Sequence, residues 1–288
     1  MDFISGKELQ DICEKENKKI SEVMREREMS LGDLTDSEMD ERLQTILDIM
    51  RKAAHDPIDN PKKSMGGLLG GEAKKLYEFG KSDKSIAGGL LSKALTYASA
   101  VLEVNATMGL IVAAPTAGSS GVLPGALLAL QEEKGFSDKE IYDGIENASA
   151  LGYILMRNSS VSGAEAGCQA EVGAASAMAA SALVELMGGT VDMCFQAAGI
   201  ALANLLGMVC DPICGLVEAP CQSRNAVGVA NAISSAEMAL AGIKNAVVFD
   251  EMAEVLLNVG KSLPATLRET AMGGMAVAPS ACQLCNQQ

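Results

Sequence analysis

Residues 170–209 read AEVGAASAMAASALVELMGGTVDMCFQAAGIALANLLGMV and form the most apolar stretch of this 288-residue chain. Alanine, glycine, methionine, leucine and valine make up most of it. Small side chains of this kind let helix backbones approach closely, whereas a β-sandwich is rich in aromatic and branched residues. Because the stretch is apolar nearly all round, it predicts buried helices.

Charged residues within the stretch argue against a bilayer span. Glu171, Glu185 and Asp192 interrupt any window of about 20 apolar residues, the length that a membrane helix requires. Residues 1–28 are charged and lack the apolar segment of a signal peptide. We therefore expect a cytoplasmic protein, in which the 8 cysteines have a role other than disulfide formation.

The composition of the whole chain excludes several classes of function. Tryptophan is missing, and 5 phenylalanines and 4 tyrosines are too few for a platform that stacks nucleic-acid bases. The net charge of −14 repels phosphate backbones and anionic lipids, so we expect neither nucleic acid nor membrane as a partner. A hydrophobic fraction of 48% suffices for a large core.

The helical pattern continues outward from this stretch and predicts an all-α fold. A capping box at residues 137–140 precedes one helix, Gly188 and Gly189 end another, and Thr190 caps the next. Only residues 110–114 suggest a short extended piece, so function is expected in the loops between buried, Ala/Gly/Met-rich helices. The predicted helices cover residues 85–104, 137–157, 163–187, 190–209, 223–243 and 249–261.

Charge divides the chain into three predicted units. Residues 1–64 hold most of the charged runs and predict two amphipathic helices, the second after a capping box at residues 35–38. Proline and glycine mark a loop over residues 56–71. We expect the N-terminal helices to pack on a helical domain, residues 65–277, which a cysteine-containing tail, residues 278–288, follows.

Two polar, glycine-rich inserts separate apolar helices. The first, APTAGSSG at 114–121, brings Thr116, Ser119 and Ser120 together just before an apolar helix. Hydroxyls and backbone N–H groups at a helix N-terminus bind anionic groups, although an ordinary capped turn has the same composition. The second insert, NSSVSG at 158–163, repeats this chemistry with Asn158, Ser160 and Ser162.

Three cysteines lie within twelve residues of one loop. They are Cys210, Cys214 and Cys221, and two prolines and a glycine restrain the loop. Thiolates without neighbouring histidines indicate an iron–sulfur cluster or zinc, and Cys168 could complete the site from a facing helix. The spacing differs from that of zinc ribbons and ferredoxins, so it does not choose between the two.

Two further features have open interpretations. Cys282 and Cys285 form a C-x-x-C pair, which suits redox or metal chemistry but also an exposed tail. His55, the only histidine, is expected beside Asp56 in a polar, proline-rich loop. One histidine argues against a Ser-His-Asp hydrolase and against a histidine-rich metal site.

Four motifs in the same order resemble those of the iron–sulfur-dependent L-serine dehydratases of bacteria. They are APTAGSSGVLPG (114–125), NSSVSGAEAGCQAEVG (158–173), CDPICGLVEAPCQSRNA (210–226) and LRETAMGGMA (267–276). The chain looks like the separate α chain of the two-subunit type. The resemblance implies a 4Fe–4S cluster with one open iron, conversion of L-serine to pyruvate and ammonia in amino-acid degradation and gluconeogenesis, and a separate β chain, hence a heteromeric lyase.

The resemblance also implies roles for individual residues. Cys168, Cys210 and Cys221 match the cluster ligands, which places the iron–sulfur site in residues 65–277. Cys214 matches no ligand, and Cys282 or Cys285 lies near the position of a fourth one. Thr116, Ser119, Ser120 and Arg224 would bind the substrate carboxylate, with Arg268 a weaker candidate, and Asn158, Ser160 and Ser162 would bind its amino group or steer its hydroxyl. The catalytic base is either His55 or a residue of the β chain.

Three alternatives remain from the sequence. A pyridoxal-phosphate dehydratase needs a Schiff-base lysine, but the candidate lysines lie in charged or loop contexts. A related iron–sulfur L-cysteine desulfidase would use the same parts on a thiol leaving group. A non-catalytic helical module with zinc in the 210–221 loop would leave the hydroxyl-rich loops without a role.

Overall fold

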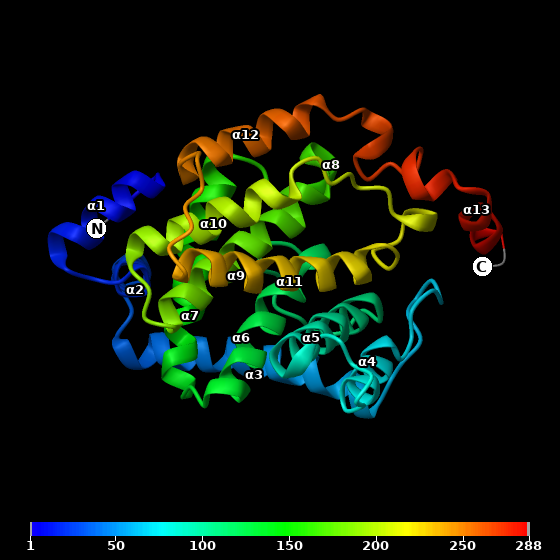
Figure 1. Cartoon of the computed structure of the whole chain (residues 1–288), viewed down its shortest axis with the longest axis horizontal. Helices are drawn as coiled ribbons and strands as arrows, with labels where there is room; N and C mark the ends of the chain where they lie inside the picture. The colour runs from blue at the N-terminus through cyan, green and yellow to red at the C-terminus, as the bar shows by residue number, and fades with distance from the viewer. Residues whose placement is uncertain (1, 287–288) are drawn as a thin grey trace.

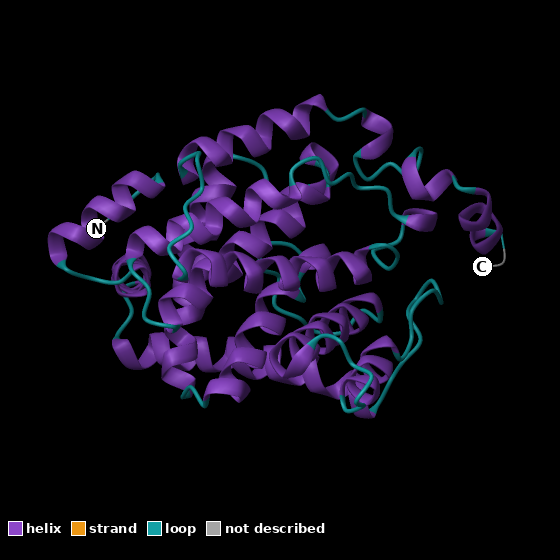
Figure 2. Cartoon of the chain, in the orientation of Figure 1, coloured by secondary structure: helices purple, strands orange, loops and turns teal. Residues whose placement is uncertain are grey.

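The computed structural model describes residues 2–286, and this range contains thirteen α-helices and no β-strand (Figure 2). The all-α prediction is confirmed. The helices are α1 (Gly6–Glu16), α2 (Ile20–Gly32), α3 (Asp36–Asp59), α4 (Glu72–Gly80), α5 (Gly88–Ala106), α6 (Val122–Lys134), α7 (Asp138–Asn158), α8 (Gly163–Ala166), α9 (Ala174–Leu186), α10 (Val191–Leu205), α11 (Cys221–Leu240), α12 (Phe249–Ser262) and α13 (Pro279–Cys285).

Helix α9 forms the centre of the molecule. Every residue from Ala174 to Glu185 is buried, and the helix packs against α6, α7, α10 and α11. Alanine and serine side chains allow this close packing on all sides, as the sequence predicts. A larger side chain, as in Ala180→Leu, would overpack the interior and destabilise it by about 1–3 kcal/mol.

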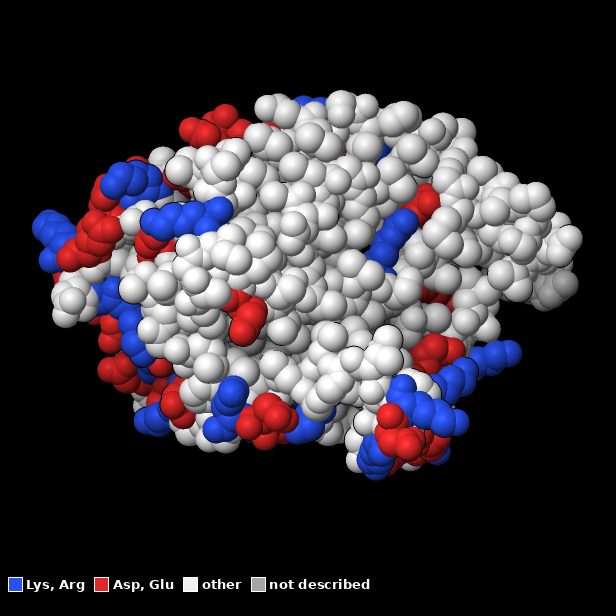
Figure 3. Space-filling model, in the orientation of Figure 1, with Lys and Arg blue, Asp and Glu red and all other residues white. Residues whose placement is uncertain are grey.

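The N-terminal helices share the central hydrophobic core. Leu9 of α1, Ile20 of α2 and Leu47 of α3 are fully buried in the same cluster as the alanines of α9. Their charged faces point outward, and in Figure 3 charged side chains gather at the left and lower edges while the middle of the face is mostly uncharged. The division at residues 64 and 277 stays a prediction.

Residues 1–64 contain three helices, whereas the sequence predicted two. Asn17 adopts a left-handed backbone, φ 53°, which ends α1, and α2 then begins at Ile20. Helix α3 continues through Pro57 to Asp59, so the loop predicted from residue 56 begins at Asn60. The last turn closes because the Asn60 N–H donates to the Asp56 carbonyl at 2.8 Å.

Other boundaries follow the sequence more closely. Side-chain oxygens of Thr35, Ser137 and Thr190 accept hydrogen bonds from backbone N–H groups three residues on, which confirms the three predicted N-caps. Gly188 lies at φ 78° beyond the end of α9. Helix α4 was not predicted, and residues 110–114 form no strand.

The segments that follow α5, α7, α10 and α12 meet at one end of the molecule, near the C-terminal helix (Figure 1). The Asn225 side chain donates to the Gly118 carbonyl, the Cys210 N–H donates to the Leu267 carbonyl, and Arg268 donates to the Glu165 carbonyl. These bonds join the four motifs recognised in the sequence. None of the helices within residues 2–286 has the length and apolar character needed to cross a bilayer.

Candidate metal centre and active site

A π-helix positions the first cysteine. The predicted helix 163–187 is broken into α8, the π-helix η2 (Gln169–Gly173) and α9, and Cys168 lies immediately before η2. Gln169 fixes this start, because its backbone N–H donates to the Met208 carbonyl and its amide donates to the Leu256 carbonyl. Its amide oxygen accepts from the Gly207 N–H at 2.8 Å. Cys168 is thereby held against the loop that follows α10.

The second cysteine lies in that loop. Cys210 forms an isolated bridge with Arg268: its N–H donates to the Leu267 carbonyl at 2.8 Å, and its carbonyl accepts from the Glu269 N–H at 2.7 Å. The segment after α12 therefore holds Cys210 as a neighbouring strand would. This bridge explains why the LRETAMGGMA motif belongs to the site although it contains no cysteine.

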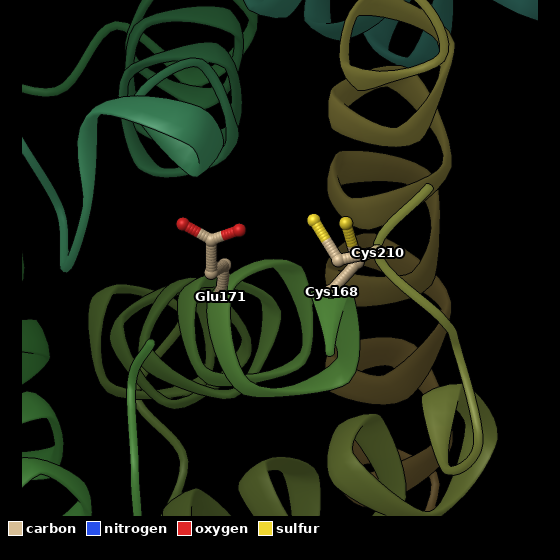
Figure 4. Close-up of side chains that lie close together, drawn as sticks. All are labelled: Cys168, Glu171 and Cys210. Atoms are coloured by element: carbon tan, nitrogen blue, oxygen red, sulfur yellow. The ribbon is translucent and has the colours of Figure 1, made fainter. Parts of the chain in front are cut away.

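Cys168, Cys210 and Glu171 converge. Their ligand atoms all lie within 4.8 Å of one another, and Figure 4 shows the two sulfurs and the carboxyl group on the same side of the helix. Gly163 leaves room for them, since a Cβ there would lie 2.6 Å from Glu171 Oε2 and 3.2 Å from Cys210 Sγ. A larger residue at this position would have to displace the Glu171 carboxylate.

The third predicted ligand begins a helix. Cys221 is the first residue of α11 and is buried. Its pKa is raised to about 12, mainly by burial and further by the negative charges of Cys168 and Glu171. Cys221 is not in the group of ligand atoms that lie within 4.8 Å of one another, so its role as the third ligand stays a prediction. The structure brings all three predicted cysteines to one end of the fold.

Arg224 connects the two cysteine-bearing segments. Its Nη2 donates to Asp211 Oδ1 at 2.7 Å, and its Nη1 donates to the Val209 carbonyl at 2.8 Å. Nη1 also donates to Cys168 Sγ at 3.4 Å. The guanidinium is thus directed at a thiol and at the cysteine loop, whereas the sequence prediction directed it at a substrate carboxylate.

The pKa values of the Cys168 and Cys210 thiols are shifted in opposite directions. The pKa of Cys168 is lowered, chiefly because the Cys210 thiol donates a hydrogen bond to its sulfur and also because Arg224 lies beside it. The same hydrogen bond, together with burial, raises the pKa of Cys210. The pair therefore stabilises one thiolate, which is the form of cysteine that binds metal.

The hydroxyl-rich loop at 114–121 faces this centre. Thr116 Oγ1 donates to Glu171 Oε1 at 2.8 Å and lies 3.1 Å from Ser119 Oγ. Ser120 is fully buried, and its Oγ has no hydrogen-bond partner among the described residues. Asn225 fixes the loop, since its side chain accepts from the Gly121 N–H and donates to the Gly118 carbonyl.

The second hydroxyl-rich segment is engaged elsewhere. The Asn158 amide donates to the Ile4 carbonyl at 2.6 Å, and its side chain is exposed. Ser160 Oγ donates to Glu165 Oε2 at 2.6 Å and accepts from the Ser162 N–H. These contacts shape the turn before α8. Their predicted role in substrate binding stays a prediction.

His55 lies on α3 and contacts neither cysteine loop through a hydrogen bond or a ring. Its Nδ1 lies 2.7 Å from the Arg51 carbonyl, its Nε2 lies 3.3 Å from Glu132, and its ring packs on Tyr97. These neighbours belong to α3, α5 and α6. These contacts hold the His55 ring against α5 and α6, and its predicted role as a base stays a prediction.

Two of the eight cysteines form a disulfide, contrary to the expectation from the sequence. Cys214 is bonded to Cys285 of α13, with a Cα–Cα distance of 5.4 Å. Contacts of α13 with the turn at Ile213–Gly215 bring the two together across a sequence separation of 71, which no spacing rule reveals. In this state Cys285 is not free to bind metal, whereas Cys282 keeps its thiol and is exposed.

Sequence reasoning missed several residues of the site. Glu171 was considered only as a charge that interrupts an apolar stretch, and Asp211 was not recognised as the partner of Arg224. Glu218 is buried, and its carboxylate accepts from Ser64 Oγ and the Leu68 N–H, which ties the 64–68 loop to the cysteine loop. A carboxylate inside an otherwise apolar segment was the available signal in each case.

The structure also contains a cavity away from the cysteines. It has a volume of about 700 Å³ and lies between α3, α5 and the segment after α5. Glu103 lines it, but the carboxylate of Glu103 already accepts from the N–H groups of Gly71 and Ala73. The cavity contains no cysteine and no histidine.

Comparison with known proteins agrees with this arrangement. The family described as "Serine dehydratase alpha chain" matches residues 15–276, which include all four motifs. The chain belongs to the serine dehydratase alpha-chain family. This family match accounts for the order of the hydroxyl loop, the two cysteine-bearing segments and the LRETAMGGMA segment in one helical unit.

Relatives in the family resemble the chain over nearly its whole length. It is 43% identical over 272 residues to "L-serine dehydratase, alpha chain" of Peptoniphilus asaccharolyticus, covering 94% of this chain and 93% of that protein. It is 42% identical over 282 residues to "Probable L-serine dehydratase, alpha chain" of Bacillus subtilis (strain 168), covering 98% and 94%. It also matches 61% of the longer "L-serine dehydratase" of Helicobacter pylori (strain ATCC 700392 / 26695), with 36% identity over 288 aligned positions and 96% of this chain covered.

Proposed function

We propose that this chain is the alpha subunit of an L-serine dehydratase, a lyase that eliminates water from L-serine to give pyruvate and ammonia. The observation that carries the proposal is the convergence of Cys168, Cys210 and Glu171 beside the 114–121 loop. The family match and the names of the relatives support the substrate. The residues present suit a 4Fe–4S cluster held by Cys168, Cys210 and Cys221.

The donor set fits such a cluster in three ways. All three candidate ligands are thiols, which iron–sulfur clusters require. Arg224 and the Cys210 thiol favour the thiolate of Cys168. Gly163 keeps a side chain away from the sulfur of Cys210. When bound, the cluster supplies an iron with an open position, a Lewis acid for the substrate hydroxyl.

Residues of this chain bind and orient the substrate. Thr116, Ser119 and Ser120 lie at the start of α6, and hydroxyls with N–H groups at a helix N-terminus bind a carboxylate. The unpaired Ser120 hydroxyl supports this role, because a buried hydroxyl without a partner is costly until a ligand satisfies it. Arg224 stabilises the loop that carries Cys210, through its hydrogen bonds to the Val209 carbonyl and Asp211.

The base that removes the Cα proton belongs, in this proposal, to a separate beta chain. His55 supports this assignment, because its ring is occupied by Arg51, Glu132 and Tyr97. An alpha chain with its cluster intact is then expected to be nearly inactive alone. Addition of the beta chain restores pyruvate formation.

The test is iron and acid-labile sulfide in the anaerobically purified chain, followed by a pyruvate assay with L-serine, with and without the beta chain. About four irons and four sulfides per chain are expected. Cys168→Ala, Cys210→Ala and Cys221→Ala should each lose bound iron. Cys214→Ala is the matched control from the same loop and should retain it.

Each alternative predicts a different result. Zinc without sulfide would support the non-catalytic module and refute the dehydratase. Faster release of sulfide from L-cysteine than of pyruvate from L-serine would indicate a desulfidase. Substantial turnover of L-serine by the alpha chain alone would disprove the assignment of the base to the beta chain.

A further inference from the structure

Glu171 is a half-buried carboxylate whose negative charge has few hydrogen-bond or ion-pair partners. Its Oε1 accepts one hydrogen bond, from Thr116 Oγ1 at 2.8 Å, and no described lysine or arginine nitrogen lies within ion-pair distance of it. Within residues 2–286, the nearest arginine of the site, Arg224, is directed at Asp211 and Cys168 instead. Among the described residues, the Glu171 carboxylate therefore has no ion-pair partner of its own.

A second carboxylate adds to the negative charge. Burial raises the pKa of Glu171, the hydrogen bond from Thr116 lowers it, and the charge of Glu269 raises it again. The Glu269 N–H donates to the Cys210 carbonyl at 2.7 Å, so Glu269 is adjacent to the same centre, where its side chain is exposed. Two carboxylates beside the thiols make this part of the site favourable for a positive group.

The position of Glu171 matches the geometry of an α-amino acid. The ammonium nitrogen and the carboxylate carbon of such a molecule are bonded to the same atom, so their binding groups must be adjacent in the protein. Thr116 contacts Ser119 on one side and Glu171 on the other. A substrate whose carboxylate binds the 114–121 loop therefore has its ammonium group beside Glu171.

We propose that Glu171 binds the ammonium group of the substrate and so selects α-amino acids over hydroxy acids of the same shape. This inference rests on the proposed function and specifies its substrate class. Asn158 and Ser160, which the sequence assigned to the amino group, donate through the Asn158 amide nitrogen to the Ile4 carbonyl and through the Ser160 hydroxyl to Glu165. Glu171 is the charged acceptor that faces the thiols.

The test compares ligands with and without an amino group. Holoenzyme carrying Glu171→Gln is assayed with L-serine and with the competitive ligand 3-hydroxypropanoate, which lacks the ammonium group. We expect the KM for L-serine to rise by about 10–100-fold, since a charge-assisted hydrogen bond contributes about 1.5–3 kcal/mol. The inhibition constant of 3-hydroxypropanoate should change by less than about threefold, within the effect of a lost neutral contact.

Two controls separate this role from others. Glu185→Gln changes a buried carboxyl of α9 that is bonded to other partners and should alter neither constant. Iron content and the electron paramagnetic resonance spectrum of the substrate-free, reduced protein should be the same in Glu171→Gln and in the unchanged enzyme. Glu171→Asp, which keeps the charge, should recover part of the affinity for L-serine.

The other outcomes overturn the inference. Equal weakening of both ligands would show that Glu171 shapes the pocket, and unchanged constants would show that it has no part in binding. Lost iron or an altered substrate-free spectrum would make it a cluster ligand. If the unchanged enzyme contains no iron and produces no pyruvate, the proposed function is wrong. That result differs from the outcomes above, which concern only the Glu171 variants.

Discussion

Two places in the molecule combine two cysteines with a glutamate, and only one of them is built as a site. The core group comprises Cys13, Cys194 and Glu185, which act on one another electrostatically where α1, α9 and α10 meet. The loop group comprises Cys168, Cys210 and Glu171. Residue types are the same in both groups, so composition alone does not distinguish them.

The difference lies in the partners. In the core group, Glu185 Oε2 accepts from the N–H groups of Ile20 and Ser21 and from the amide of Asn147. Burial raises the pKa of Cys13 to about 12 and also raises that of Cys194, so both remain neutral thiols. The core group is thus held by three donors on one carboxylate oxygen, while the other, Glu185 Oε1, is buried without a hydrogen-bond partner among the described residues.

In the loop group the partners are incomplete. Glu171 has one hydrogen-bond donor, and the neighbouring Cys210 and Arg224 lower the pKa of Cys168. A negative charge and unfilled acceptor positions remain at the meeting point of four loops. We infer that a thiol whose pKa is lowered by its neighbours distinguishes the loop group from the core group, where burial raises the pKa of both thiols.

The largest expected effect concerns metal binding. Cys168→Ala should lose nearly all of the iron bound after anaerobic reconstitution, because a cluster ligand is removed. Cys13→Ala and Cys194→Ala should retain all of it, because neutral core thiols act as small apolar side chains. Iron and acid-labile sulfide per chain measure both effects, and loss of iron from either core variant would break the comparison.

A smaller effect is expected on stability. Here the variant in the core group should lose more than the variant in the loop group. Glu185→Ala leaves three donors in the interior without an acceptor and should lower the free energy of unfolding of the metal-free chain by about 2–4 kcal/mol. Glu171→Ala removes the acceptor of one hydroxyl and should cost less than about 1 kcal/mol. Urea denaturation measures both values. Equal losses would show that the core glutamate is no better satisfied than the loop glutamate.

A further expected effect is a dependence of stability on pH, and it arises at Glu146. Glu146 of α7 is 2% exposed, and burial raises its pKa to about 8 although Arg25 lies beside it. Between the usual value near 4.5 and about 8, the folded chain keeps a proton that the unfolded chain has lost. Its contribution to stability is therefore full below the lower value and lost as the pH rises.

Comparing the original chain with Glu146→Gln isolates the contribution of Glu146 protonation to stability. The difference in unfolding free energy between the original chain and the variant should fall with rising pH by at most about 1.4 kcal/mol per unit. The decline should end above pH 8, where both states are ionised. A flat difference between pH 5 and 8 would contradict the raised pKa, and a rise would reverse its sign.

Much of the fold could be predicted from the sequence because periodicity and capping act locally. The apolar residues of α9 and the cap at Thr190 identify their elements without knowledge of neighbours. Asn17 could not be predicted to end α1, because its left-handed conformation interrupts a continuous apolar pattern. Pro57 was misleading for the reverse reason, since α3 tolerates it in its last turn.

The site could be predicted only in part. The cysteines and hydroxyls follow from motifs, but partners between motifs depend on the tertiary fold. The pairing of Arg224 with Asp211, that of Thr116 with Glu171 and the disulfide of Cys214 are contacts of this kind. Asn158 contacts the Ile4 carbonyl and His55 contacts Glu132 at the surface, and the polar residues next to them in the sequence did not predict these contacts.

The π-helix at Gln169–Gly173 has a consequence for insertions and deletions. A single π-turn accommodates one residue more than an α-helical turn, so it is equivalent to a one-residue insertion. Deleting one residue there would restore an α-helix and rotate the preceding chain by about 100° around the axis. Cys168 would then leave the side of the helix that faces Cys210, while every residue of α9 stayed in place. A gap of one position at this point in a related sequence would therefore mark a protein whose cysteine cannot serve the same centre.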